Sequence, residues 1–305
     1  MKKIFITAGL ALGLTACGNG SPFTSPNTVA PGDPNTEVNK RYLFDTAKNL
    51  TANQFTYDAT ANTIVINNLP FDGVSSNGGS YTPSTPATLP NGALMYQNTP
   101  GAGEDQYYAV VYVSPDGTGA LIGAVGTNAY RKFGYGGAYA ERPSSGLPPT
   151  RAAAYSYTGN YVGIRVLRQD TTGTADGIQY TTGNANITVD LQNLDAGGSI
   201  KGTITGRQVY STGGVLAGSL SSIILNQTSI DTTTNRTKAA VADTLKNDGT
   251  QAQVGTWEGS FSGPAGQEIV GFVLVEGAIS DGDKGYDATN AVNGRETGGF
   301  IVKRP

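Results

Sequence analysis

Apolar and polar residues alternate strictly along residues 255–263, in the last fifth of the chain. Every second position is glycine or aromatic, with Trp257 and Phe261 as the large members, and the positions between them are polar or charged. Successive side chains of a strand point to opposite faces, so this pattern predicts a half-buried β-strand. We expect Trp257 and Phe261 to fill the interior of the protein.

The residues that follow extend this strand into a β-hairpin over residues 254–277. A Pro-Ala-Gly sequence at residues 264–266 supplies the turn, because proline fixes φ and glycine accepts a positive φ. On the second strand, residues 268–277, small and large apolar groups alternate on one face: Ile269, Gly271, Val273 and Val275. This alternation is typical of a closed, tapering barrel, where a ring beside one position leaves no room beside the next.

Hairpin patterns also occur in the first half of the chain. Residues 54–57 and 63–67 flank a turn that contains Asp and Asn, and residues 106–113 and 119–126 flank a Ser-Pro-Asp-Gly turn. Residues 74–103 are rich in Ser, Gly, Pro, Thr and Asn. We expect a long surface loop there, with one short strand near residues 93–96.

The second half of the chain predicts an antiparallel meander. Tyr and Gly alternate with mostly polar residues over 155–163, in the rhythm of the hairpin above, and the last strand is expected at residues 298–304. Pairing between these two strands would close the barrel and remove both sheet edges. The intervening strands are expected at residues 187–191, 199–206 and 222–225, with a short helix at residues 238–246.

Composition supports an all-β fold. The chain has 305 residues, 43 of them Gly and 15 Pro, and no long amphipathic helix pattern. We expect an eight-stranded antiparallel β-barrel at the C-terminus, preceded by a handle-like β-rich domain. The expected division is a signal peptide at residues 1–16, a flexible tether at 17–36, the handle-like domain at 37–142, a linker at 143–151 and the barrel at 152–305.

Several classes of function are excluded by the residues that the sequence lacks. It contains no histidine and a single cysteine, which excludes a Ser-His-Asp triad, a His-ligated metal and an internal disulfide. The formal charge is −3, or −5 once Lys2 and Lys3 leave with a signal peptide, and no basic stripe is present. We therefore predict no nucleic-acid partner and no cofactor.

The N-terminus has the pattern of a bacterial lipoprotein signal. Lys2 and Lys3 precede an apolar run that is too short to span a membrane and that ends in Leu-Thr-Ala-Cys17. This tetrapeptide resembles a lipobox, in which the cysteine receives a diacylglycerol and is usually acylated again, which gives a stable anchor. We predict lipidation at Cys17 and anchoring in the outer membrane, with display on the cell surface left open. The Gly-, Ser- and Pro-rich residues that follow form a tether.

Three segments of the second half resemble a known family. They are Ala154-Tyr155-Ser156-Tyr157-Thr158-Gly159, the run Gly259-Ser260-Phe261-Ser262-Gly263-Pro264 with Gln267-Glu268-Ile269-Val270-Gly271, and Gly299-Phe300-Ile301-Val302-Lys303-Arg304. They resemble the barrel domain of transferrin-binding protein B and related surface lipoproteins, over residues 152–305. The resemblance implies an eight-stranded lipoprotein barrel preceded by a handle-like β-domain.

The chain also departs from that family. The transferrin receptors carry two lobes, each a handle plus a barrel, and this chain is long enough for one lobe. Val270 and Phe272 replace smaller residues expected in the second strand, and the loops that bind transferrin have no recognisable match. The ligand is therefore not predicted by the resemblance.

Two acidic groups are candidate sites. Asp281, Asp283 and Asp287 offer calcium-type oxygen ligands, but Tyr286 and Val292 stand where an EF-hand needs Gly and Glu, so we predict a solvated loop and no metal. A second group, at hairpin positions with no sign of a pocket, is predicted to lie on an exposed outer face rather than to perform acid–base chemistry: Glu258, Glu268 and Glu276.

Tyr-rich segments leave two interpretations open. Tyr107-Tyr108 and residues 135–139 could form contact surfaces or could pack in a core. The function predicted overall is a non-catalytic lipoprotein that binds an extracellular protein or small solute. The alternative is a structural or adhesive envelope lipoprotein without a soluble ligand.

Overall fold

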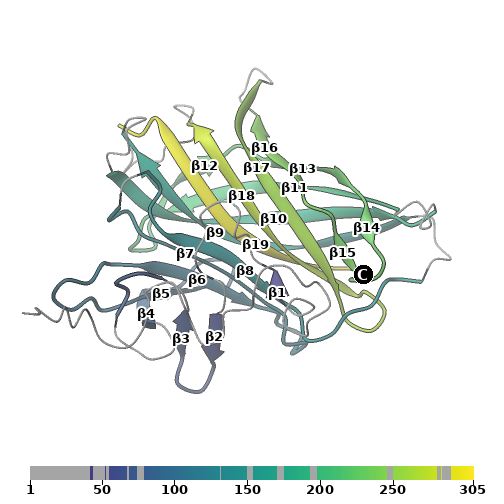
Figure 1. The fold of residues 1–305 in the computed structure, drawn as a ribbon, viewed down its shortest axis with the longest axis horizontal. Coiled ribbons are helices and arrows are strands. Elements are labelled where there is room, and N and C mark those ends of the chain that lie inside the picture. The colour runs from purple at the N-terminus through teal and green to yellow at the C-terminus, as the bar shows by residue number, and fades with distance from the viewer. Residues whose placement is uncertain are drawn as a thin grey trace, which may run out of the picture.

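The computed structural model describes residues 42–43, 52, 55–66, 69–73, 79–130, 132–149, 154–169, 175–192, 198–245, 250–279, 283 and 290–305. The described residues form two β-sheets, and the second is closed into a barrel that lies over the first (Figure 1). None of the described residues forms a helix with the length and apolar character needed to cross a membrane.

The C-terminal sheet is the expected eight-stranded antiparallel barrel. Two strand pairings close the sheet into a barrel. β19 pairs with β9, with Phe300 opposite Tyr161, and β17 pairs with β18. This confirms the predicted pairing of the last strand with the strand at Tyr155. The barrel strands are β9 (Ala154–Arg168), β10 (Ala175–Asp190), β11 (Ser199–Tyr210), β13 (Ile223–Thr228), β16 (Ala240–Leu245), β17 (Gln251–Ser262), β18 (Glu268–Ala278) and β19 (Asn293–Lys303).

Three short strands pair with the barrel strands without being part of the eight-stranded barrel. β12 (Leu216–Leu220) pairs with the end of β11, while β14 (Ile230–Asp231) and β15 (Arg236–Thr237) form a ribbon beside β17.

The N-terminal sheet has eight strands in the order β1-β8-β7-β6-β5-β4-β3-β2. It curls so strongly that β2 lies over β7 and β8, which encloses a core of its own. The strands are β1 (Tyr42–Leu43), β2 (Phe55–Asp58), β3 (Thr63–Ile66), β4 (Gly79–Thr88), β5 (Leu94–Gln97), β6 (Tyr108–Val113), β7 (Leu121–Gly126) and β8 (Gly136–Glu141).

Alternation of side chains distributes the barrel residues between two cores. Trp257 and Phe261 are fully buried in the barrel interior, as the sequence predicts. Residues of the opposite face, among them Val270 and Phe272, are buried between the barrel and the N-terminal sheet. Contact with the N-terminal sheet therefore accounts for the large side chains of Val270 and Phe272.

Two local predictions are wrong. The predicted loop over residues 74–103 contains β4, a strand whose Pro83 and Pro86 obscured it in the sequence. Its residues 79–81 pair with β3, and its residues 82, 83 and 88 pair with β5. The predicted helix at residues 238–246 is instead strand β16, which pairs with β13 and β17. Sheet pairing overrides the weak helix preference of this Ala- and Lys-containing segment.

The molecule has two ends, which we call distal and proximal. At the distal end lie the β9–β10, β11–β12, β16–β17 and β18–β19 connections of the barrel, together with the β3–β4, β5–β6 and β7–β8 connections of the N-terminal sheet. The guanidinium of Arg168 donates to the carbonyl of Tyr130 at 2.8 Å, and that of Arg295 lies 4.9 Å above the ring of Phe133, which joins the two sheets there. The chain terminus and β1, which pairs Tyr42 with Glu141, lie at the proximal end.

Candidate functional site

The acidic residues of the hairpin do not form a joint site. Glu268 and Glu276 are eight positions apart on one strand, which corresponds to about 26 Å. Glu276 accepts hydrogen bonds from Arg295 at the distal end, and Glu258 is half-buried between them. The prediction that all three lie on an exposed face is wrong for Glu268, which is buried where the N-terminal sheet covers the barrel.

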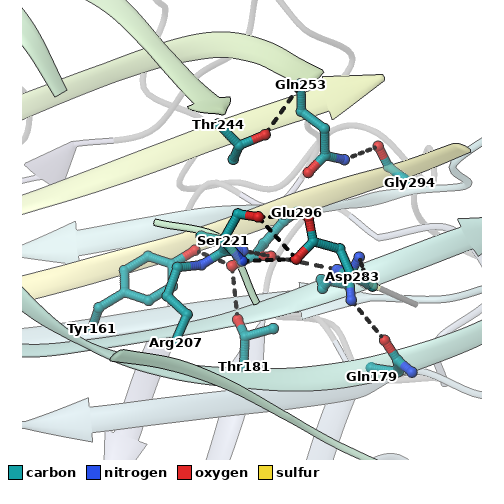
Figure 2. A network of polar contacts seen from close by, with 11 residues as sticks. Tyr161, Gln179, Thr181, Arg207, Ser221, Thr244, Gln253, Asp283, Gly294 and Glu296 are labelled. Atoms are coloured by element: carbon teal, nitrogen blue, oxygen red, sulfur yellow. Dashed lines mark hydrogen bonds and ion pairs between the residues drawn. The ribbon is translucent and has the colours of Figure 1, made fainter. Parts of the chain in front are cut away.

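Instead, the barrel interior holds a cluster of charges around Glu296. The carboxylate of Glu296 is fully buried and accepts hydrogen bonds from the hydroxyls of Tyr161 at 2.8 Å and Thr181 at 3.0 Å. It forms an ion pair with Arg207 and lies 3.6 Å from Nε of Arg165. Four strands therefore converge on one carboxylate (Figure 2).

The cluster continues toward the distal end of the barrel. Arg165 donates to the side chain of Gln179 at 3.0 Å and to the backbone carbonyl of Asp283 at 2.8 Å. Arg207 donates to the carbonyl of Ser221, whose own N–H and hydroxyl donate to the Asp283 carboxylate (Figure 2). The cluster thus links the interior to the residues at the barrel mouth.

Strand alternation places these side chains, and glycines make room for them. Tyr161, Gly163 and Arg165 occupy successive inward positions of β9, and Gly163 pairs with Gly298 of β19. A Cβ on Gly163 would lie 2.8 Å from the Tyr161 hydroxyl, and one on Gly298 would collide with the same hydroxyl. Both glycines are needed for the Tyr161 ring to reach Glu296.

The electrostatics of the cluster are those of a buried structural network. Burial raises the pKa of Tyr161 well above its usual value, and the charge of Glu296 raises it further. Burial lowers the pKa of Arg165 to about 10, against the opposing effect of Glu296. Tyr161 and Arg165 therefore keep their ordinary protonation at neutral pH.

The predicted acidic loop is only partly described. Asp281 and Asp287 lie outside the described residues, whereas Asp283 is hydrogen-bonded to Ser221. Among the residues that the structure describes, no group of three or more acidic or thiol side chains has the arrangement of a metal site. Arg165, Arg207 and Glu296 were not predicted from the sequence, although Arg165 and Glu296 stand at inward-facing positions of β9 and β19.

The tyrosine-rich segments support the packing interpretation. Tyr107 and Tyr139 are fully buried in the core of the N-terminal sheet. Tyr108 lies at the junction of the two sheets, where its ring meets the ring of Tyr180 edge-to-face at 6.4 Å.

Polar contacts fix the N-terminal sheet to the barrel at its proximal end. Arg142, which is buried, donates to the carbonyls of Phe261 at 2.6 Å, Thr234 at 2.8 Å and Asn235 at 3.2 Å. Burial, and then the charge of Arg236, lower the pKa of Arg142 to about 9.

A second proximal contact involves the turn between β6 and β7. Ser114 donates to the buried carboxylate of Glu268 at 2.9 Å, and Lys303 forms ion pairs with both Asp116 and Glu268. With the distal contacts of Arg168 and Arg295, these bonds hold the two sheets in one fixed arrangement.

Comparison with known proteins places this fold beside those of several surface lipoproteins. No family model matches the sequence, and no curated protein matches it. Transferrin-binding protein B of Haemophilus parasuis has 15% identity and a TM-score of 0.40, over 81% of this chain and 43% of that one. The protein from Neisseria meningitidis has 15% identity and a TM-score of 0.38, over 83% and 41%.

The haemoglobin receptor HpuA of Kingella denitrificans also matches, with 14% identity and a TM-score of 0.34, over 90% of this chain and 92% of that one. The chain therefore spans less than half of the two transferrin-binding proteins and nearly all of the haemoglobin receptor.

Proposed function

We propose that this protein is a lipid-anchored outer-membrane lipoprotein that binds an extracellular protein through its distal end. The anchor is the lipid on Cys17, and the handle-like domain and the barrel together form the binding body. A small solute is the narrower alternative for the ligand.

The observation that carries this proposal is the position of the exposed apolar side chains. The described residues contain seven large apolar side chains that are exposed. Val241 lies on the side of the barrel, and Val254, which pairs with Glu276, lies on the barrel wall beside the distal end. The other five lie on connections or strand ends at the distal end: Phe71, Val215, Leu216, Leu245 and Val292. Exposed apolar groups gathered in this way mark protein interaction sites.

Both sheets contribute to this end. Val215 and Leu216 lie at the tip of the β11–β12 hairpin, next to Gly214, where a Cβ would lie 2.8 Å from Pro86 of the N-terminal sheet. Phe71 lies on the β3–β4 connection and has a positive φ of 57°, a strained conformation that is typical of functional loops.

The position of β1 at the proximal end supports an orientation in which the distal end points away from the membrane. The described chain begins at β1, at the proximal end, and the predicted tether and anchor precede it in the sequence. A chain held to the membrane from that end directs the distal loops away from the lipid. The polar contacts between the sheets keep the distal strand ends of the two sheets in a fixed relation, which lowers the entropic cost of binding.

Two experiments test the proposal. Immobilised mature protein, incubated with host or environmental fluids, is expected to capture a partner in a saturable manner. Capture of no saturable partner from any fluid would contradict the proposal and favour the structural or adhesive alternative. Protease treatment of intact cells is expected to cleave the folded part before the outer membrane is broken, and survival until that point would rule out surface display.

A further inference from the structure

The contacts of Ser221 with Asp283 form a carboxylate cradle at the barrel mouth. The backbone N–H of Ser221 donates to Oδ1 of Asp283 at 2.7 Å, and its hydroxyl lies 2.8 Å from Oδ2 and 3.1 Å from Oδ1. One residue therefore contacts both oxygens of the carboxylate. Hydrogen bonds to an ionised acceptor are the strong ones in proteins, and two of them fix its orientation.

The cradle is held from behind by the two arginines of the interior cluster. The carbonyl of Ser221 accepts a hydrogen bond from Arg207, which ties Ser221 to the interior cluster, while its N–H is directed at the Asp283 carboxylate. Arg165 reaches the same place from β9, and the charge of Asp283 acts on its guanidinium. Cradle and cluster are therefore one connected structure (Figure 2).

The formal charges of the cluster require an anion at this position. Arg165, Arg207 and Glu296 are 1%, 3% and 0% exposed, so two positive groups and one negative group are buried together. The carboxylate of Asp283 supplies the second negative charge. An uncompensated charge in a low-dielectric interior is costly, so removal of this carboxylate would leave a site that attracts another anion.

We propose that the Ser221 cradle, with Arg165 and Arg207 behind it, is a binding site for a small monocarboxylate, and that Asp283 occupies it from within the chain. A free carboxylate competes with Asp283 for the Ser221 N–H and hydroxyl. This site is separate from the exposed distal side chains, so it stands whether or not a protein partner is captured there.

The test is chemical rescue of a variant that lacks the internal ligand. Asp283→Ala removes the carboxylate and keeps Ser221, and formate is the probe, with chloride at equal ionic strength as the reference. We expect formate to raise the thermal midpoint of D283A several-fold more than that of the wild type, because only in the variant is the cradle free. An equal rise in both proteins would overturn the proposal.

A second variant identifies the cradle itself. Ser221→Ala combined with D283A removes the hydroxyl donor, and the response to formate is expected to fall to that of the wild type; a response that persists would contradict the assignment. If D283A does not fold in chloride, its refolding yield in formate gives the same answer. Recovery in formate supports the site, and equal failure in both salts rejects it.

Discussion

The ring of Phe55 in β2 stacks on the ring of Tyr139 in β8, with 5.1 Å between centroids and 6° between planes. These two strands stand almost at opposite ends of the strand order, so the stack draws the N-terminal sheet around its own core. The stack therefore stabilises the curved surface of the N-terminal sheet that covers the barrel. It also fixes the strand ends that this sheet contributes to the distal end.

Phe55→Ala is therefore expected to destabilise the N-terminal sheet by about 3 to 5 kcal/mol, the usual cost of removing a buried aromatic ring. Urea unfolding followed by tyrosine fluorescence measures the change. Phe71→Ala is the matched control, because Phe71 is 58% exposed and its loss should change stability by less than about 0.5 kcal/mol. Equal effects of the two changes would show that the stack does not close the sheet.

Arg142→Met should weaken the junction between the sheets. The change removes the donors to three carbonyls of the barrel while keeping most of the side-chain volume. We expect a loss of roughly 2 kcal/mol or more, because the carbonyls of Phe261 and Thr234 lose this donor and each buried acceptor left without a partner costs about 1 to 3 kcal/mol. The carbonyl of Asn235 still accepts from the N–H of Phe261. Calorimetry should then resolve two unfolding transitions in place of one. Arg304→Met, which removes a cation–π contact with Tyr155, should cost less than about 1 kcal/mol and leave one transition.

Glu296→Gln tests the buried cluster. The amide keeps an acceptor for Tyr161 but leaves the charges of Arg165 and Arg207 without their buried counter-ion. Breaking a buried ion pair in this way typically costs about 3 to 5 kcal/mol. Glu276→Gln, at the more exposed pair with Arg295, should cost less than about 1 kcal/mol, and denaturant titrations that give similar values for both would refute a structural role of the cluster.

Because of the raised pKa of Asp72, the N-terminal sheet is expected to be more stable in mild acid than at neutral pH. Burial raises the pKa of its carboxyl from 3.8 to about 6, although Tyr81 donates to it at 3.0 Å. Because the folded pKa is the higher one, the stabilisation is complete below pH 3.8 and is lost as the pH rises through 6.

Asp72→Asn removes this dependence, since the amide oxygen still accepts from Tyr81. We expect the variant to exceed the wild type by about 2 to 3 kcal/mol at pH 7 and to match it near pH 4, because one pKa unit corresponds to about 1.4 kcal/mol. Unfolding free energies at both pH values measure this. A variant that gains nothing at pH 7 would show that the carboxylate is not desolvated.

The alternation of side chains between the two faces of a strand explains how much of the fold could be predicted from the sequence. Trp257 and Phe261 alternate with polar residues in a half-buried strand, so the pattern indicated both the strand and its inward face. Strand β10 shows the limit of this signal: only its last part, from Ile187, was predicted, because Ile178 and Tyr180 are the only large apolar residues in the part before it. Strand β4 failed for the same reason, since its prolines and serines are typical of loops.

The site was less predictable because its members are distant in the sequence. Arg165 and Glu296 become neighbours only when β9 pairs with β19, and the pairing of strands 130 positions apart is not encoded locally. The sequence nevertheless contained one indication of the buried cluster, a charged residue at an inward-facing position of a barrel strand. Glu268 was misjudged in the same way, because the sheet that buries it is formed by the other half of the chain.

The exposed distal side chains provide the most direct test of the proposed function. Val215→Asp combined with Leu216→Asp alters the hairpin tip, and Val241→Asp alters a side chain on the barrel wall whose exposed fraction is close to that of Leu216. Binding isotherms of the captured partner should show at least a tenfold loss of affinity for the double variant, equivalent to about 1.4 kcal/mol or more, and no change for Val241→Asp. Equal affinities for the wild type and both variants would contradict binding at the distal end.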